Sequence, residues 1–496
     1  MRKPKGSPLL NEKPSEPHGR QLDLGTKLSF SLAAVAAGTL SMGMTWFSMV
    51  YYNAALGVSA AVVGGALAAA LTVDAISDPL VGAWSDRTET RWGRRHPFMY
   101  AAVLPSALFF WLFWNPPDWV FASDAVTFSF LFLVTTAVRL TVTFFDVPVM
   151  ALVPELTDDY DGRSDLLNFH SNAIYGWTAV VTAGMYGIFL VPTDDFTTGM
   201  LNVVGYQDAG LYGAVITALA MLGCAIGLQK HIPRLVKEQK ALPLVTHRFR
   251  DFLKPFKNKS LASLLGSRLI SAAVFGTQAA LFMYMFRYFW GLPEDVLFVY
   301  SLVAVIGVPI AFWLVPRIFY GREKRRVGIA VLIYGLFVDV GPIMLRLFDL
   351  MPANGTDALT YTFYALGIAQ NIAGILIAVA IGSMLVEVVD DHAAQTGDQM
   401  AGLISSSQTF MKKATSGLGT LIGGWVLVLI AFPTQTDVAD VSPETILQLG
   451  VIYGPVMSVL GLAAIWVLMG YRITRADHDA NIANLARRAE SAQAKE

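Results

Sequence analysis

Twelve apolar runs, each long enough to cross a lipid bilayer, dominate this 496-residue sequence. A hydrocarbon core of about 30 Å needs about 20 apolar residues in a helix, because each residue adds about 1.5 Å along the axis. The runs cover residues 28–52, 59–82, 98–115, 125–150, 166–190, 211–229, 261–290, 296–319, 327–348, 358–384, 400–431 and 445–471. They predict an all-α membrane protein of twelve transmembrane helices.

The composition supports this interpretation and excludes several classes of protein. Apolar residues make up 54% of the chain and charged residues only 15%, whereas a soluble domain carries about 25% charged residues. The net charge of -1 gives no reason to expect nucleic acid as a partner. Cys224 is the one cysteine, so no intrachain disulfide can form.

Basic residues fall on alternate loops between the runs. Arg and Lys follow the second, sixth and eighth runs, whereas the loops at 115–125, 192–210 and 433–444 contain acids but no Lys or Arg. By the positive-inside rule, both termini are expected in the cytoplasm of a multi-pass protein of the cell membrane. The predicted cytoplasmic segments are an N-terminal tail (1–27), a central loop (230–260) and a C-terminal tail (472–496).

Two landmarks recur at one spacing along the chain. Glu155 follows the fourth run, and Glu387 follows the tenth run 232 positions later. The pairs Asp158–Asp159 and Asp390–Asp391 differ by the same 232 positions. A repeat close to half the chain length predicts two pseudo-symmetric six-helix bundles with a substrate path between them. The predicted halves are residues 28–229 and 261–471.

Ionisable side chains within the runs are the candidate functional residues, because a charge at the bilayer centre costs roughly 2.5–3.5 kcal/mol. Asp74 and Asp78 lie one turn apart on one face of the second predicted helix, about 18 and 12 Å from its cytoplasmic end. Thr143 and Asp146 lie about 18 and 13 Å from the same end of the fourth helix. These oxygens predict a site for a monovalent cation or a proton. The alternative is that the acids pair with buried Arg or Lys for assembly and that Thr143 bonds its own helix.

Four basic residues within the predicted spans are further candidates. Lys413 is about 22 Å inside the eleventh helix, counted from Asp398, and is the natural cationic counterpart of the acids. Lys412 points to another side of that helix, and the sequence leaves open which lysine faces the cavity. Arg139 and Arg268 are further buried candidates, for a binding or a structural role.

Enzymes and nucleotide-driven pumps are not indicated. The sequence contains no Walker loop, no zinc-protease motif and no nucleophile elbow. We therefore expect no catalytic residues and no cofactor, and movement of a small solute by an ion gradient or by plain facilitation. We also expect the protein to be a monomer. A non-transporting membrane sensor is the alternative, although it needs a docking domain and the longest aqueous segment has about thirty residues.

Three segments strongly resemble the glycoside-pentoside-hexuronide:cation symporter family. They are Asp74–Phe98 (DAISDPLVGAWSDRTETRWGRRHPF), Asp146–Glu155 (DVPVMALVPE) and Gln408–Lys413 (QTFMKK). The resemblance implies the major facilitator fold. It also implies symport of a sugar, glycoside or uronide with Na⁺, H⁺ or Li⁺ by alternating access.

The resemblance also implies roles for individual residues. The implied cation ligands are Asp74, Asp78 and Thr143, with Ser77 where the family's type member has Asn. The implied substrate-binding residues are Asp146, Lys413, Gln408 and Thr409, with Arg139 as a further candidate. The implied gating loop contains Asp86, Arg87, Arg91, Arg94, Arg95 and Glu155.

The sequence departs from the family's type member at the sugar-binding positions. Gly38 replaces a sugar-binding Asp, Met150 replaces a Trp, and Asn172 replaces an Arg. Specificity for galactosides is therefore not expected. Lysolipid transporters resemble the family at the same Asp pair and Lys, so a non-sugar amphiphile is the alternative solute.

Overall fold

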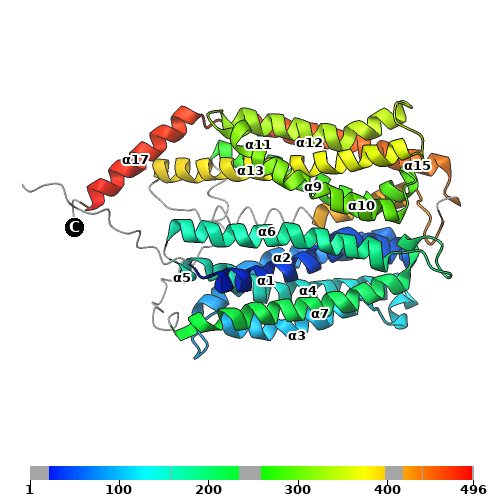
Figure 1. Ribbon diagram of the computed structural model, residues 1–496, viewed down its shortest axis with the longest axis horizontal. Helices are drawn as coiled ribbons and strands as arrows, with labels where there is room; N and C mark the ends of the chain where they lie inside the picture. Colours follow the sequence, from blue (N-terminus) through cyan, green and yellow to red (C-terminus); the bar gives the residue numbers. More distant parts are fainter. Residues whose placement is uncertain (1–21, 158, 234–257, 397–416, 438–439, 494–496) are drawn as a thin grey trace, which may run out of the picture.

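The described part of the chain is entirely helical (Figure 1). The computed structural model describes residues 22–157, 159–233, 258–396, 417–437 and 440–493, and within these ranges no strand is present. The predicted all-α class is confirmed.

Six long helices form the first half. They are α1 (Leu24–Met42) with η1 (Gly43–Phe47) and η2 (Val50–Ala55), α2 (Ala60–Arg87), α3 (His96–Trp114), α4 (Asp124–Ala151), α6 (Tyr160–Gly184) with η4 (Met185–Phe189), and α7 (Val203–Leu228). Short helices η3 (Asp118–Ala122), α5 (Val153–Leu156), η5 (Gly199–Leu201) and η6 (Gln229–His231) lie at their ends.

The second half repeats this pattern. It contains α9 (Lys259–Tyr284) with η8 (Met285–Phe289), α10 (Glu294–Ala304), α11 (Gly307–Phe319), α12 (Lys324–Leu347), α13 (Asp357–Thr396), the helix Gly417–Leu429, and α15 (Pro443–Val451) with η10 (Ile452–Val456) and α16 (Met457–Leu468). The polar helix α17 (Arg475–Gln493) follows as a tail.

Ten helices in the described residues are long and apolar enough to cross a membrane. Two other helices complete a set consistent with the twelve predicted spans. The fifth span, α6 with η4, carries polar residues over its first turns and so falls short in hydropathy. The eleventh is described only as Gly417–Leu429, because residues 397–416 of the predicted run 400–431 lie outside the described part of the chain.

Local side-chain contacts explain where the helices depart from the predicted bounds. The sixth helix starts at Val203 rather than 211, because the Asn202 side chain accepts a hydrogen bond from the Gly205 N–H at 3.0 Å and caps it. The eighth span is interrupted between α10 and α11. There Gly307 packs so closely on α13 that a Cβ atom would lie 2.6 Å from the Ile368 carbonyl oxygen.

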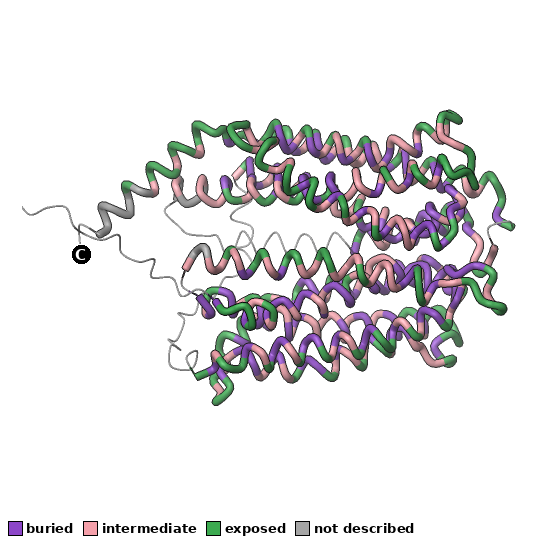
Figure 2. Tube along the Cα trace, viewed as in Figure 1, coloured by how far each residue is buried: buried purple, intermediate pink, exposed green. Residues whose placement is uncertain are grey.

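The two halves lie side by side with their helices running along the long axis of the molecule (Figure 1). We call the end that holds α5 and α17 the terminal end and the opposite end the distal end. Buried residues are concentrated where the halves meet toward the distal end, whereas α6 carries many exposed residues toward the terminal end (Figure 2).

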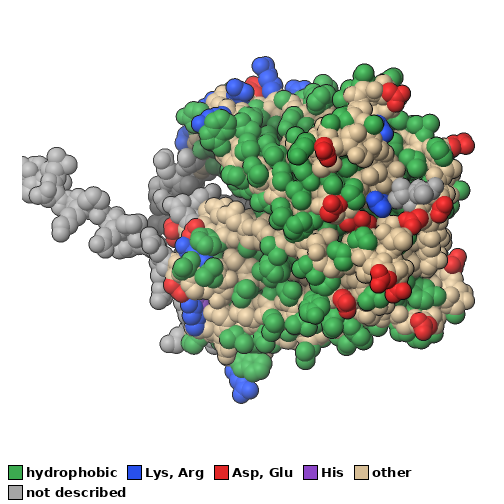
Figure 3. Space-filling view, turned by 45° about the vertical axis from the view of Figure 1, so that its right-hand side comes forward, with side chains coloured by type: hydrophobic (Ala, Val, Ile, Leu, Met, Phe, Trp, Pro, Cys, Tyr) green, Lys and Arg blue, Asp and Glu red, His purple; other side chains and the backbone are tan. Residues whose placement is uncertain are grey.

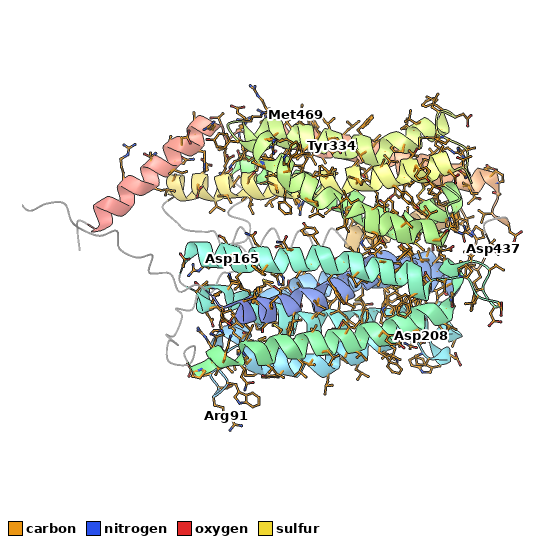
Figure 4. The ribbon with its side chains drawn as sticks, in the orientation of Figure 1. Arg91, Asp165, Asp208, Tyr334, Asp437 and Met469 are labelled. Carbon is orange, nitrogen blue, oxygen red and sulfur yellow. The ribbon has the colours of Figure 1, made fainter. Side chains whose placement is uncertain are left out.

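Hydrogen bonds hold the halves together at the distal end. The Tyr284 hydroxyl donates to Asn53 Oδ1 at 2.7 Å, and the Met200 N–H donates to Glu294 Oε1 at 3.1 Å. Asp437, labelled at the distal end in Figure 4, accepts from the Thr197 hydroxyl at 2.7 Å. Every hydrogen bond recorded between the halves in the described residues lies at this end, so the distal end is closed.

Charged side chains separate along the same axis. Figure 3 shows most acidic side chains of the visible face toward the distal end and most basic ones toward the terminal end. A broad belt of hydrophobic side chains lies between them. This distribution matches a belt in lipid between two aqueous surfaces.

We predict that Tyr284→Phe opens the distal end. The substitution removes one buried hydrogen bond between the halves, worth about 1 kcal/mol, and so shifts the population toward separated distal ends by about fivefold. Spin labels at the exposed positions Asp194 and Asp357, in a Cys224→Ser background, report the distance between the halves.

Tyr334→Phe is the matched control, because the Tyr334 hydroxyl donates to the Ala369 carbonyl at 3.2 Å within one half. It should leave the distances unchanged. If Tyr284→Phe does the same, the hydrogen bond to Asn53 does not hold the distal end closed.

Candidate functional site

The candidate cation site is built on the long contact between α2 and α4. Asp74 is buried and Asp78 is half-buried, one turn apart on α2. The Thr143 Oγ1 on α4 lies 3.1 Å from Asp74 Oδ1 and 2.9 Å from Asp78 Oδ1. The structure therefore brings together the three residues that the sequence predicts as cation ligands.

The fourth predicted cation residue, Ser77, is also buried beside this cluster. Its hydroxyl donates to the Asp74 backbone carbonyl at 2.9 Å. Such a bond satisfies the hydroxyl within its own helix. Ser77 is therefore placed next to the two acids while its hydroxyl is engaged with the α2 backbone.

Arg139 lies against the same acids. Its Nη1 is 3.4 Å from Asp74 Oδ2, and this ion pair joins α4 to α2. Arg139 is one turn from Thr143, which is why both side chains reach α2 from one face of α4. The sequence leaves Arg139 open between a substrate-binding and a structural role, and the structure places its guanidinium against Asp74 of the candidate cation site.

This arrangement has a clear electrostatic consequence. Arg139 compensates Asp74, and Asp78 and Thr143 add further oxygen atoms beside it. Carboxylate and hydroxyl oxygens suit a hard monovalent cation, or one carboxylate can take up a proton. A cation that binds Asp74 has to compete with Arg139 for its oxygen atoms.

Of the predicted substrate residues, the structure describes those of the first half but not those of the second half. Asp146 is half-buried on α4, one turn from Thr143. Lys413, Gln408 and Thr409 lie outside the described residues, as does Lys412. Gly417, four positions after Lys413 in the sequence, packs on α2, where a Cβ atom would lie 2.9 Å from Leu71 Cβ.

Aromatic side chains occupy positions that the sequence analysis missed. At Gly38, which replaces an acid of the type member, a Cβ atom would lie 3.2 Å from Trp177 Cδ1, and the Trp177 indole N–H donates to Thr39 Oγ1 at 2.8 Å. The Trp46 ring contacts Phe282 of the other half edge-on, with centroids 5.3 Å apart. The sequence signal for Trp177 is a single Trp in the most polar span.

The predicted gating loop forms a compact ion-pair cluster at the terminal end of the first half. The Arg95 side chain, only 5% exposed, lies 2.6 Å from Asp86 and 3.1 Å from Glu155. Arg94 lies 3.4 Å from Glu155. The other two predicted members, Arg87 and Arg91, are exposed, with Arg91 at the terminal end in Figure 4.

The second half repeats the glutamate of this cluster. Glu387, the counterpart of Glu155, lies 3.1 Å from Lys324 Nζ and accepts a hydrogen bond from the Tyr471 hydroxyl at 2.7 Å. Both glutamates thus bind a basic residue of their own half. The repeat predicted from the sequence spacing has a matching repeat of interactions.

Two helical halves around a polar intramembrane cluster define a secondary transporter of the major facilitator type. Residues 29–475 match the family described as "MFS/sugar transport protein". The chain belongs to this family.

Curated relatives cover nearly the same length. An isoprimeverose transporter of Lactiplantibacillus pentosus is 22% identical over 92% of this chain and 90% of its own length. A glucuronide carrier protein homolog of Escherichia coli is 24% identical over 83% of this chain and 85% of its own length. Among solved structures, the nucleoside transporter NupG matches with a TM-score of 0.56 at 15% identity, covering 90% of this chain and 98% of that one. This last likeness concerns the fold alone.

We predict that Arg95→Ala destabilises the protein far more than Arg91→Ala. Removing Arg95 leaves Glu155 partly buried without its nearest charge partner, at a cost of about 2–3 kcal/mol. Arg91 is exposed on the same loop, so its loss should cost less than about 0.5 kcal/mol.

A thiol-reactive dye measures this difference, because Cys224 is fully buried and reacts only on unfolding. The melting temperature of Arg95→Ala should fall by several degrees while that of Arg91→Ala stays unchanged. Equal melting temperatures would show that the Arg95 cluster contributes nothing to stability.

Proposed function

We propose that this chain is a cation-coupled symporter that moves a small organic solute, a sugar, glycoside or uronide, by alternating access. Na⁺ or H⁺ is the coupling ion. The single observation that carries this proposal is the bridge that Thr143 makes between Asp74 and Asp78 inside the first half. The names of the relatives, which include an isoprimeverose transporter and a glucuronide carrier protein homolog, support the substrate class.

In this proposal the cation binds to Asp74, Asp78 and Thr143, with Ser77 at the margin. Cation binding displaces Arg139 from Asp74, and the freed guanidinium then faces the substrate beside Asp146. Each ligand thereby favours binding of the other, and this coupling free energy is reciprocal. Lys413, Gln408 and Thr409 contribute from the second half.

Alternating access follows from the two ends of the molecule. In the state that the structure describes, hydrogen bonds hold the two halves together at the distal end. In the opposite state the distal bonds open, and the gating loop, from Asp86 to Arg95 with Glu155, closes the terminal end against the second half. Only the empty or doubly loaded carrier crosses between the two states, which is what coupling requires.

The proposed placement puts the terminal end in the cytoplasm of the cell membrane, because the basic side chains lie there. The tails (1–27 and 472–496) and the central loop (230–260) are then cytoplasmic, and residues 28–229 and 261–471 are the two halves. We further propose that the protein works as a monomer with no catalytic activity and no cofactor.

We predict that Asp78→Asn abolishes coupling, and Asp74→Asn likewise. An amide keeps the shape of the side chain but supplies no negative charge for the cation. In proteoliposomes with an imposed Na⁺ or H⁺ gradient, accumulation of glycosides or uronides should fall by at least about tenfold, as expected for loss of about 1.4 kcal/mol or more of cation binding.

Asp124→Asn is the control, because Asp124 is an exposed acid at the first turn of α4. It should accumulate solute as the wild type does. Normal accumulation by both Asp74→Asn and Asp78→Asn would refute the cation site. If the protein accumulates a lysolipid and no sugar, the alternative solute is correct. If it binds a solute without transporting it, the protein is a sensor.

We predict that Lys413→Ala changes ion dependence and that Lys412→Ala does much less. Lys413 is proposed to balance the acids of α2 and α4 across the cavity in the unloaded carrier, so its loss leaves their charge under-compensated. Uptake per inserted molecule, measured against Na⁺ and pH for both variants, distinguishes a cavity lysine from an assembly lysine. Equal behaviour of the two variants would contradict the assignment of Lys413.

A further inference from the structure

Arg268 is a charged side chain inside a membrane span. It lies nine residues beyond the start of α9 at Lys259, about 13 Å along the helix axis. The side chain is half-buried, and its Nε is fully enclosed. Within the described residues, this Nε has no hydrogen-bond acceptor and the guanidinium forms no ion pair.

Two other enclosed arginines of the described chain are compensated by carboxylates. Arg139 lies 3.4 Å from Asp74. Arg95 lies 3.1 Å from Glu155. Since a buried charge is costly without a counter-charge, the surroundings of Arg268 favour the binding of an anion from outside the chain.

The helical spacing shows which way Arg268 faces. Phe275 and Phe282 follow it at steps of seven residues, which places all three side chains on one face of α9. Both phenylalanine rings contact Trp46 of the first half edge-on, at 5.9 and 5.3 Å between centroids. This face of α9 therefore points toward the space between the halves.

The opposite face of α9 is occupied by packing within the second half. The Ser263 hydroxyl donates to the Val467 carbonyl of α16. The Thr277 hydroxyl donates to the Gly419 carbonyl at 3.1 Å. With that side used for assembly, Arg268 is left on the side of the substrate path.

The surroundings of Arg268 suit a solute with both a ring and an anionic group. Phe275, 52% exposed, lies two turns or about 10 Å toward the distal end on the same face and forms an aromatic wall with Trp46. Such a wall packs against the apolar face of a sugar ring. The planar guanidinium fork of arginine matches a carboxylate, sulfate or phosphate through two parallel hydrogen bonds.

We propose that Arg268 is the anion-binding residue of the substrate site, and that the transported solute carries an oxyanion, with a carboxylate on the sugar as the expected form. This inference rests on the proposed function and narrows its substrate class. In the described state Arg139 is engaged by Asp74 in the first half, whereas Arg268 can bind an anion without first leaving a carboxylate of the described residues.

The first test uses the wild-type protein and matched pairs of solutes that differ only in charge. The pairs are 4-nitrophenyl β-glucuronide against 4-nitrophenyl β-glucoside, galacturonate against galactose, and glucose 6-phosphate against glucose. Binding is measured by thermal shift in Na⁺ at neutral pH. We expect the anionic member of at least one pair to bind about tenfold or more tightly than its neutral partner, as for a charged hydrogen bond.

The second test uses Arg268→Gln and Arg268→Lys. Arg268→Gln should remove most of the preference for the anion and change affinity for the neutral partner less than about twofold, because only the charge-assisted bonds are lost. Arg268→Lys should retain part of the preference, since it keeps the charge without the fork. Arg326→Gln, whose side chain is 85% exposed, is the control and should leave the preference intact.

Several results would overturn the assignment. Equal binding within every pair, binding of neutral members alone or no binding by any anionic member would each exclude an anion site in the wild type. If Arg268→Gln binds anionic over neutral solutes as strongly as the wild type does, another residue is responsible for the preference. If any of these results is found together with gradient-driven uptake of neutral sugars, only the anion site is refuted. If no solute is taken up in response to a gradient, the proposed function itself is refuted.

Discussion

The free-energy cost of a charge in hydrocarbon is the constraint on which the arrangement of the described spans depends. It explains why Asp74 and Asp78 of α2 face α4, where Thr143 bridges them and Arg139 compensates Asp74. These same contacts hold α2 against α4 within the first half. A cluster that stabilises the bundle and also gathers carboxylate and hydroxyl oxygens can serve assembly and ion binding together.

The two halves use this constraint differently. The first half places Asp74 beside Arg139 and joins Asp74 to Asp78 through Thr143. The second half places Arg268 on its inner face with no counter-charge in the described residues. A solute that bridges the halves would therefore meet the acids of the proposed cation site on one side and a guanidinium on the other, and this asymmetry would orient an anionic solute between them.

The two ends of the molecule are stabilised by different interactions. At the distal end, neutral and singly charged hydrogen bonds such as Tyr284 to Asn53 cross between the halves. At the terminal end, the strong ion pairs of Arg95 and of Glu387 remain within their own halves. Each half thus stays rigid on its own, while the bonds that cross between the halves at the distal end are individually weak enough to break and reform.

The sequence by itself determined the all-α class, most helix positions and which acids lie within the spans, because hydropathy, helical period and rare intramembrane acids are local signals. It left Arg139 open between a binding and a structural role, and it missed Trp177 beside Gly38 and the break before Gly307. Only the tertiary structure decided these points. They depend on which faces of distant helices meet, as when Arg139 reaches Asp74 across 65 positions of sequence, and no local pattern encodes that meeting.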